Sequence, residues 1–133
     1  MTNTEGAAIA SVIAETRGIV TNQVNRVREF ILETEADKRT LQRLQAIECI
    51  LNKAEYAAGR CQTGRLIDLL AEAIAKLAVS NVPVCNVPDA DSSTSLVRGK
   101  LLSFEAGVRA NMLTYARVTL IELLGGVRLM VAV

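Results

Sequence analysis

The side chains that could perform acid–base chemistry in this chain are carboxylates, because none of its 133 residues is a histidine. That absence excludes the commonest general base, the commonest zinc ligand and every Ser–His or Cys–His nucleophile pair. Asp68, Glu72 and Lys76 follow at spacing four in an otherwise apolar segment, a pattern typical of a solvated helix strip with a Glu72–Lys76 ion pair. Glu105 and Glu122 are further carboxylates on the last predicted helix. The sequence has no catalytic motif around any of them, so we predict no catalytic residue and no enzymatic activity.

The cysteines Cys49, Cys61 and Cys85 are widely spaced and form no metal-binding pattern. Carboxylate metal sites of helical bundles use Glu-x-x-His pairs, which a chain without histidine lacks. The glycines form no phosphate-binding loop. We therefore expect no metal, no cofactor, and cysteines that are small buried hydrophobes in a reducing compartment. A Cys61–Cys85 disulfide is the one pairing left open, because a helix would hold Cys49 and Cys61 about 18 Å apart.

The charges are nearly balanced, with 15 basic and 14 acidic residues and a net charge of +1. Proteins that neutralise many phosphates usually carry an excess of Lys and Arg. One basic cluster is interleaved with Glu and Asp and has no aromatic neighbour placed to stack on bases. We expect a self-paired, solvated surface there, and we do not expect nucleic acid to be a partner. The cluster comprises Arg26, Arg28, Lys38, Arg39 and Arg43.

Half of the residues are hydrophobic, mostly Ala, Leu, Val and Ile, and none is Trp. Such cores pack through many aliphatic contacts, which suits helix-on-helix packing. The sequence therefore predicts a single helical domain over 1–133, an all-α bundle of three to four helices with one or more long helices. The start lacks a basic signal-peptide region, and no apolar run reaches the roughly 18 residues of a membrane span. We expect a cytoplasmic protein, or part of an assembly formed from cytoplasm.

Heptad spacing predicts a long first helix over about 5–33, capped by Thr4. A polar stretch over 33–40 follows, and apolar spacing resumes in a second helix over about 35–59. Residues 5–58 then form either a helical hairpin that turns at about 34–39 or one continuous helix with a phase shift. The hairpin is favoured because the seams before and after the polar stretch do not share a register. The apolar seam of the first helix consists of two series of residues spaced by seven. One series is Ile13, Val20 and Val27, and the other is Val24 and Ile31.

Gly59 and Gly64 predict a corner, with Thr63 as the cap of a third helix over about 64–80. Nearly the whole circumference of that helix is apolar, so we expect it in the middle of a packed structure. The stretch 81–95 contains both prolines and is long for a loop in so small a domain. It is either a crossover between antiparallel helices or a functional loop.

The last predicted helix runs over about 96–124 and has two apolar faces, whereas a surface helix needs only one. Gly125-Gly126 predicts its end. The tail 127–133 is apolar with one charge and would be a sticky, strand-prone segment if exposed, so we expect it to dock on its own bundle or on a neighbouring subunit. The two faces are Val97, Leu101, Phe104, Val108, Met112 and Tyr115, and Leu102, Ala106, Leu113, Ala116, Leu120 and Leu124.

Apolar surface beyond the needs of one small bundle predicts a non-enzymatic, self-associating helical subunit, a structural or assembly protein of a particle, filament or complex. The alternative is a partner-binding adaptor or regulatory protein; a nucleic-acid-associated protein is a weaker one. Self-association is expected from apolar residues of the last helix and tail: Leu113, Leu120, Leu124, Leu129, Met130 and Val131. An adaptor would use the apolar residues of the proline-containing loop: Val82, Pro83, Val84, Val87 and Pro88.

Overall fold

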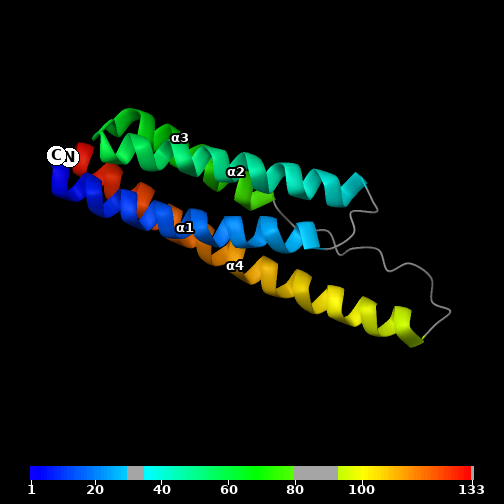
Figure 1. The fold of residues 1–133 in the computed structure, drawn as a ribbon. Coiled ribbons are helices and arrows are strands. Elements are labelled where there is room, and N and C mark those ends of the chain that lie inside the picture. Colours follow the sequence, from blue (N-terminus) through cyan, green and yellow to red (C-terminus); the bar gives the residue numbers. More distant parts are fainter. Residues whose placement is uncertain (30–34, 80–92, 133) are drawn as a thin grey trace.

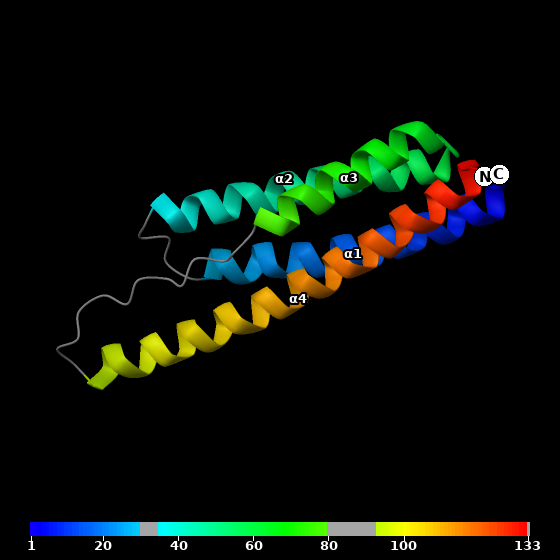
Figure 2. The ribbon, with the colours of Figure 1, turned by 180° about the vertical axis from the view of Figure 1, so that it is seen from behind.

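The computed structural model describes residues 1–29, 35–79 and 93–132, with side chains over 1–28, 38–77 and 111–132. The secondary structure of these ranges is helical: α1 (Asn3–Glu29), α2 (Glu35–Gly59), α3 (Thr63–Val79) and α4 (Ser93–Ala132). Successive helices run in alternating directions, so both chain termini lie at the same end of the molecule (Figure 1, Figure 2). The predicted all-α helical bundle is confirmed.

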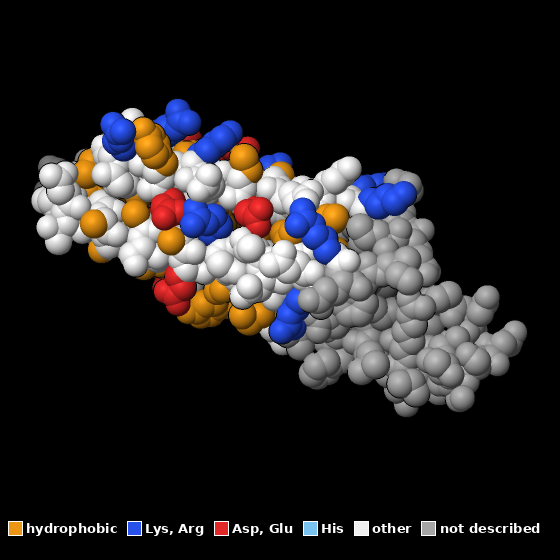
Figure 3. All heavy atoms as spheres, viewed as in Figure 1, with side chains coloured by type: hydrophobic (Ala, Val, Ile, Leu, Met, Phe, Trp, Pro, Cys, Tyr) orange, Lys and Arg blue, Asp and Glu red, His pale blue; other side chains and the backbone are white. Residues whose placement is uncertain are grey.

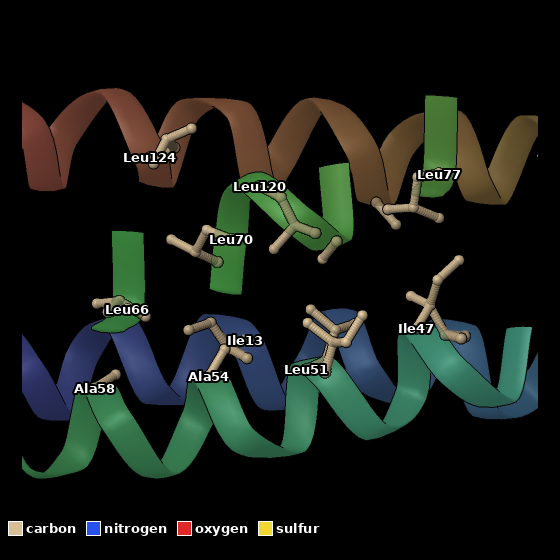
Figure 4. Packing of buried hydrophobic residues seen from close by; sticks show 14 of the residues in the cluster. Ile13, Ile47, Leu51, Ala54, Ala58, Leu66, Leu70, Leu77, Leu120 and Leu124 are labelled. Carbon is tan, nitrogen blue, oxygen red and sulfur yellow. The ribbon is translucent and has the colours of Figure 1, made fainter. Parts of the chain in front are cut away.

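Each helix packs against its sequence neighbours, and α1 also packs against α4, so the bundle closes on itself. The core lies along the middle and is almost wholly aliphatic. Leu70 of α3 and Leu120 of α4 point toward Ile13 of α1 and Ala54 of α2 (Figure 4). The many small aliphatic contacts expected from a chain without Trp therefore come from all four helices of the described residues.

The first half of the chain is a helical hairpin, since α1 and α2 are separate antiparallel helices that pack against each other (Figure 1). The predicted series Ile13, Val20 and Val27 is buried, and so is Val24. Ile31 lies outside the described residues. Arg17, which interrupts the seam in the sequence, reaches α2 and forms an ion pair with Glu55.

Two polar residues of the α1 seam are buried, which the apolar pattern did not indicate. Thr16 is satisfied locally, because its hydroxyl donates to the carbonyl of Val12 at 2.9 Å. Gln23 is only 2% exposed, and its Oε1 has no donor among the described residues. Ile9, Thr16 and Gln23 follow one another at seven-residue spacing, so a further series along α1 mixes one apolar with two polar side chains.

The first turn of α1 is capped by Thr2 rather than by Thr4. The backbone N–H of Glu5 donates to Thr2 Oγ1 at 3.1 Å, and that hydroxyl donates to Glu5 Oε1 at 3.1 Å. Thr2 and Glu5 thus stand in the S/T-x-x-E relation of a capping box. The prediction of Thr4 was wrong because Glu5 pairs with the Thr three residues before it.

The corner between α2 and α3 is a Schellman-type turn centred on Cys61. The N–H of Gln62 donates to the carbonyl of Ala57 at 2.9 Å, and the N–H of Cys61 donates to that of Ala58 at 3.1 Å. Cys61 has φ of 55°, the left-handed conformation that this turn demands and that glycine usually supplies. Thr63, predicted as the cap, is the first residue of α3, and its hydroxyl donates back to the carbonyl of Cys61.

The third helix is less enclosed than its composition predicts. Leu66, Leu70 and Leu77 are buried, but Asp68 and Glu72 are exposed. The helix packs against α2 and α4 only, within the described part of the chain, so its outer face meets solvent. The expectation of a central position was wrong, because in a four-sided bundle each helix has two neighbours and one free side.

The fourth helix does not end at Gly125-Gly126 but continues to Ala132. Two glycines inside a helix cost about 1 kcal/mol each relative to alanine. Val127 is buried in the core, and full burial of such a side chain contributes roughly 1.5–3 kcal/mol. Packing thus offsets the local preference, and the predicted tail is the last two turns of α4.

Helix α4 also begins at Ser93, earlier than predicted, and its 40 residues give it a length of about 60 Å. The 27 residues of α1 span only about 40 Å. The beginning of α4 therefore projects beyond the ends of the other three helices, at the end of the molecule away from the termini (Figure 1, Figure 2). Most of the predicted proline-containing loop lies outside the described residues.

Candidate functional site

The residues predicted to mediate self-association divide into two groups. Leu113, Leu120 and Leu124 are buried against the other helices of their own chain. They are therefore removed from the predicted association surface, because a side chain covered by its own core has no area left for a second subunit. Leu129 is 71% exposed, and Met130 and Val131 are exposed as well. The predicted loop residues Val82, Pro83, Val84, Val87 and Pro88 lie outside the described residues.

An exposed apolar stripe runs along the side of α4 that faces away from the core. We call it the α4 outer stripe; it consists of Tyr115, Val118, Ile121, Gly125 and Leu129. The spacing of three, three, four and four residues keeps these positions on one side of a helix with 3.6 residues per turn. Figure 3 shows hydrophobic side chains gathered along the lower edge of the described molecule, where α4 passes in Figure 1.

The area of this stripe exceeds that of scattered surface hydrophobes. Its four side chains are about half exposed or more, and each presents on the order of 100 Å². Together with Met112 at its edge the stripe reaches roughly 500 Å², within the range of the largest apolar patch on a typical monomer, which is often functional. The sequence prediction missed the stripe because neither predicted face of the last helix included Val118 or Ile121, and because the predicted helix end at Gly125 separated Leu129 from the other members.

Two opposite charges flank the outer stripe. Arg117 and Glu122 are exposed and lie on opposite sides of Val118 and Ile121 around the helix. Neither has an ion-pair or hydrogen-bond partner among the described residues. Both charges are therefore available to a molecule that covers the stripe.

A shallow apolar groove of about 310 Å³ runs between α1 and α4. A Cβ added at Gly126 would meet no atom within 4 Å, so the glycine leaves the groove open. Glu122 supplies a charge at the rim of this otherwise apolar lining. The groove is lined by Ile9, Val12, Thr119, Glu122, Leu123, Gly126, Val127 and Met130.

A second, more open groove of about 540 Å³ lies over α1 and α2. Its floor is polar: Arg17 donates to Asn52 Oδ1 at 2.8 Å and pairs with Glu55. The guanidinium of Arg60 stacks over the ring of Tyr56 at 5.0 Å from the centroid. Arg17 is neutralised by Glu55, which leaves Arg60 as the unneutralised cation among the described residues of the lining.

The residues considered for chemistry are dispersed. Asp68, Glu72 and Glu122 are exposed, and the side chain of Glu105 lies outside the described residues. Cys49 is an exposed free thiol, so the expectation that it is buried was wrong. Cys61 is a half-buried free thiol; Cys85 lies outside the described residues. No three His, Cys, Asp or Glu side chains of the described ranges lie close enough together to hold a metal ion.

The predicted basic cluster does collect at one end of the α1–α2 hairpin. Arg26, Arg28, Lys38 and Arg39 are exposed, and Arg43 is half-buried. Arg26, Lys38 and Arg43 each have an interaction partner. The interleaved acidic side chains lie outside the described ones, so the self-pairing of this cluster stays a prediction.

Comparison with family models, with curated proteins and with solved structures finds nothing that matches this chain. In the described ranges, none of the helices combines the length and apolarity that crossing a membrane would require.

Proposed function

We propose that this chain is a non-enzymatic, self-associating helical subunit with a structural or assembly role. The observation that supports the proposal is the α4 outer stripe, a continuous apolar surface on a helix whose opposite face already fills the core. Apolar patches of this extent are often functional surfaces that another molecule covers.

The area sets the strength expected of the contact. Two stripes of roughly 500 Å² each would bury about 1,000 Å² in total, at the low end of specific interfaces. A dimer held by the stripe alone is therefore expected to be weak, with a dissociation constant in the micromolar range. Larger assemblies would gain affinity by repeating the contact, since multivalent binding strengthens weak contacts.

Sedimentation equilibrium of the purified chain between about 5 and 200 µM tests the proposal. We expect a concentration-dependent rise in mass; a monomer at 200 µM overturns the proposal. The chain provides a matched pair of tyrosines, because Tyr115 is 58% and Tyr56 is 59% exposed. Tyr115→Ser is expected to weaken association several-fold, whereas Tyr56→Ser on α2 leaves it unchanged.

The second candidate is a partner-binding adaptor, and the apolar groove between α1 and α4 favours it. In that case the groove would receive an apolar segment of a different protein. A chain that stays monomeric yet binds an apolar dye, and loses the dye in Gly126→Leu, would support the adaptor over the subunit. Circular dichroism of the same variant would show that the helices are retained.

A further inference from the structure

We propose that the α4 outer stripe binds the α4 of a second copy in parallel, so that Asn111, Val118 and Gly125 each face their own equivalents and Arg117 of one copy meets Glu122 of the other. This inference rests on the proposed function and adds the direction and register of the contact to it. Three observations carry it: the heptad spacing of the residues along the middle of the stripe, the charges on its flanks and the open space outside Gly125.

The spacing matches a heptad seam over the described part of α4. Asn111, Val118 and Gly125 form a seven-residue series, and Thr114 and Ile121 form the second series four residues before Val118 and Gly125. These five residues occupy the side of the helix opposite Leu113, Leu120 and Val127, which are buried in the core. An asparagine in the first series of a seam is a known means of fixing register in parallel pairs.

The charges decide the direction. In a parallel pair, one flank of each helix meets the other flank of its partner, and the residue directly before a first-series position contacts the residue five positions later in the partner chain. Arg117 and Glu122 have that spacing and lie on the two flanks, so a symmetric parallel pair makes this contact twice. In an antiparallel pair, each flank of one helix meets the same flank of its partner. Arg117 would then face only Arg117, Leu124 or Val131 of the partner, and Glu122 would face only Tyr115, Glu122 or Leu129. No pair of opposite charges forms in that arrangement.

The space around the seam permits close approach of a second helix. A Cβ built at Gly125 would meet nothing of its own chain within 4 Å, so no side chain of the bundle covers this position. Arg117 and Glu122 have no partners among the described residues of their own chain, so pairing across the interface breaks no existing bond. Arg128 stands at the next seam position, so the uncharged seam extends over about 111–125, roughly 21 Å of helix.

Charge reversal tests the pairing of Arg117 with Glu122. We expect Arg117→Glu and Glu122→Arg each to raise the dimer dissociation constant about five- to tenfold, because each places like charges opposite each other twice. The double variant is expected to restore the wild-type constant to within about twofold. If the double variant weakens the dimer as much as the two single variants do in combination, the pairing of Arg117 with Glu122 is overturned.

Disulfide trapping tests the direction in a background that carries Cys49→Ser and Cys85→Ser, with that parent as the control. In a parallel pair, Asn111→Cys and Gly125→Cys each cross-link to their own equivalents. In an antiparallel pair centred on Val118, neither variant cross-links alone, and only their equimolar mixture does. If cross-links form only in the equimolar mixture, the parallel register is overturned, whereas the proposed self-association is still supported. A parent chain that stays monomeric at 200 µM overturns the proposed function itself.

Discussion

Gly6 of α1 lies tightly against the end of α2, and replacing this glycine with alanine is expected to destabilise the protein. A Cβ built on Gly6 would lie 2.5 Å from the carbonyl oxygen of Ala58 and 3.1 Å from Cys61 Sγ. The first distance is shorter than real Cβ contacts, and the atom that it meets belongs to the backbone. The helices would have to move apart, which would disturb the corner at Cys61.

The magnitude follows from two opposing contributions. Alanine gains at most about 1 kcal/mol over glycine from helix propensity. Overpacking of a tight contact typically costs about 1–3 kcal/mol. We therefore expect Gly6→Ala to lower the free energy of unfolding by about 1–2 kcal/mol. Gly18→Ala is the matched control, because a Cβ at this exposed position of α1 meets nothing within 4 Å. It is expected to raise that free energy by about 0.5–1 kcal/mol.

Urea unfolding followed by far-ultraviolet circular dichroism measures both changes, at one low concentration so that association does not contribute. The two variants should differ by about 1.5–3 kcal/mol, and the slope with urea should be unchanged. A Gly6→Ala protein as stable as Gly18→Ala would refute the reasoning, because it would mean that α1 and α2 do not approach each other closely at this crossing.

Three further predictions concern residues whose surroundings conflict with their type. Cys61→Gly is expected to be about 1 kcal/mol more stable than Cys61→Ala in the same urea assay, because only glycine adopts positive φ without strain; equal stability would argue against the left-handed corner. Gln23→Leu is expected to raise the free energy of unfolding by about 1 kcal/mol, since it removes a buried oxygen that has no donor among the described residues; a loss of stability would indicate a hidden partner. Val127→Ala is expected to cost about 1–2 kcal/mol, whereas Leu129→Ala should leave stability within about 0.5 kcal/mol, because only the first is buried.

The sequence alone determined the helical class and the main seam of α1, and it favoured the hairpin over one continuous helix. Those features depend on periodicity, which is local: Ile13, Val20 and Val27 recur at seven residues, and the seam loses register in the polar stretch before α2. The thin polar line of α3 was likewise predicted to be solvated, and Asp68 and Glu72 are exposed. Amphipathic patterns of this kind survive folding because they are what drives the helices together.

Only the tertiary structure decided where α4 ends and which of its faces is free. Glycine at 125 and 126 favours a stop locally, but burial of Val127 against the bundle extends the helix to Ala132. The sequence shows two apolar faces on α4, and nothing in it says which one the bundle covers. Because α1 and α3 occupy one side of α4, Leu113, Leu120 and Leu124 became core, and the outer stripe, of which only Tyr115 belonged to a predicted face, was left exposed. Excess apolar surface is thus readable from composition, whereas its position depends on contacts between distant segments.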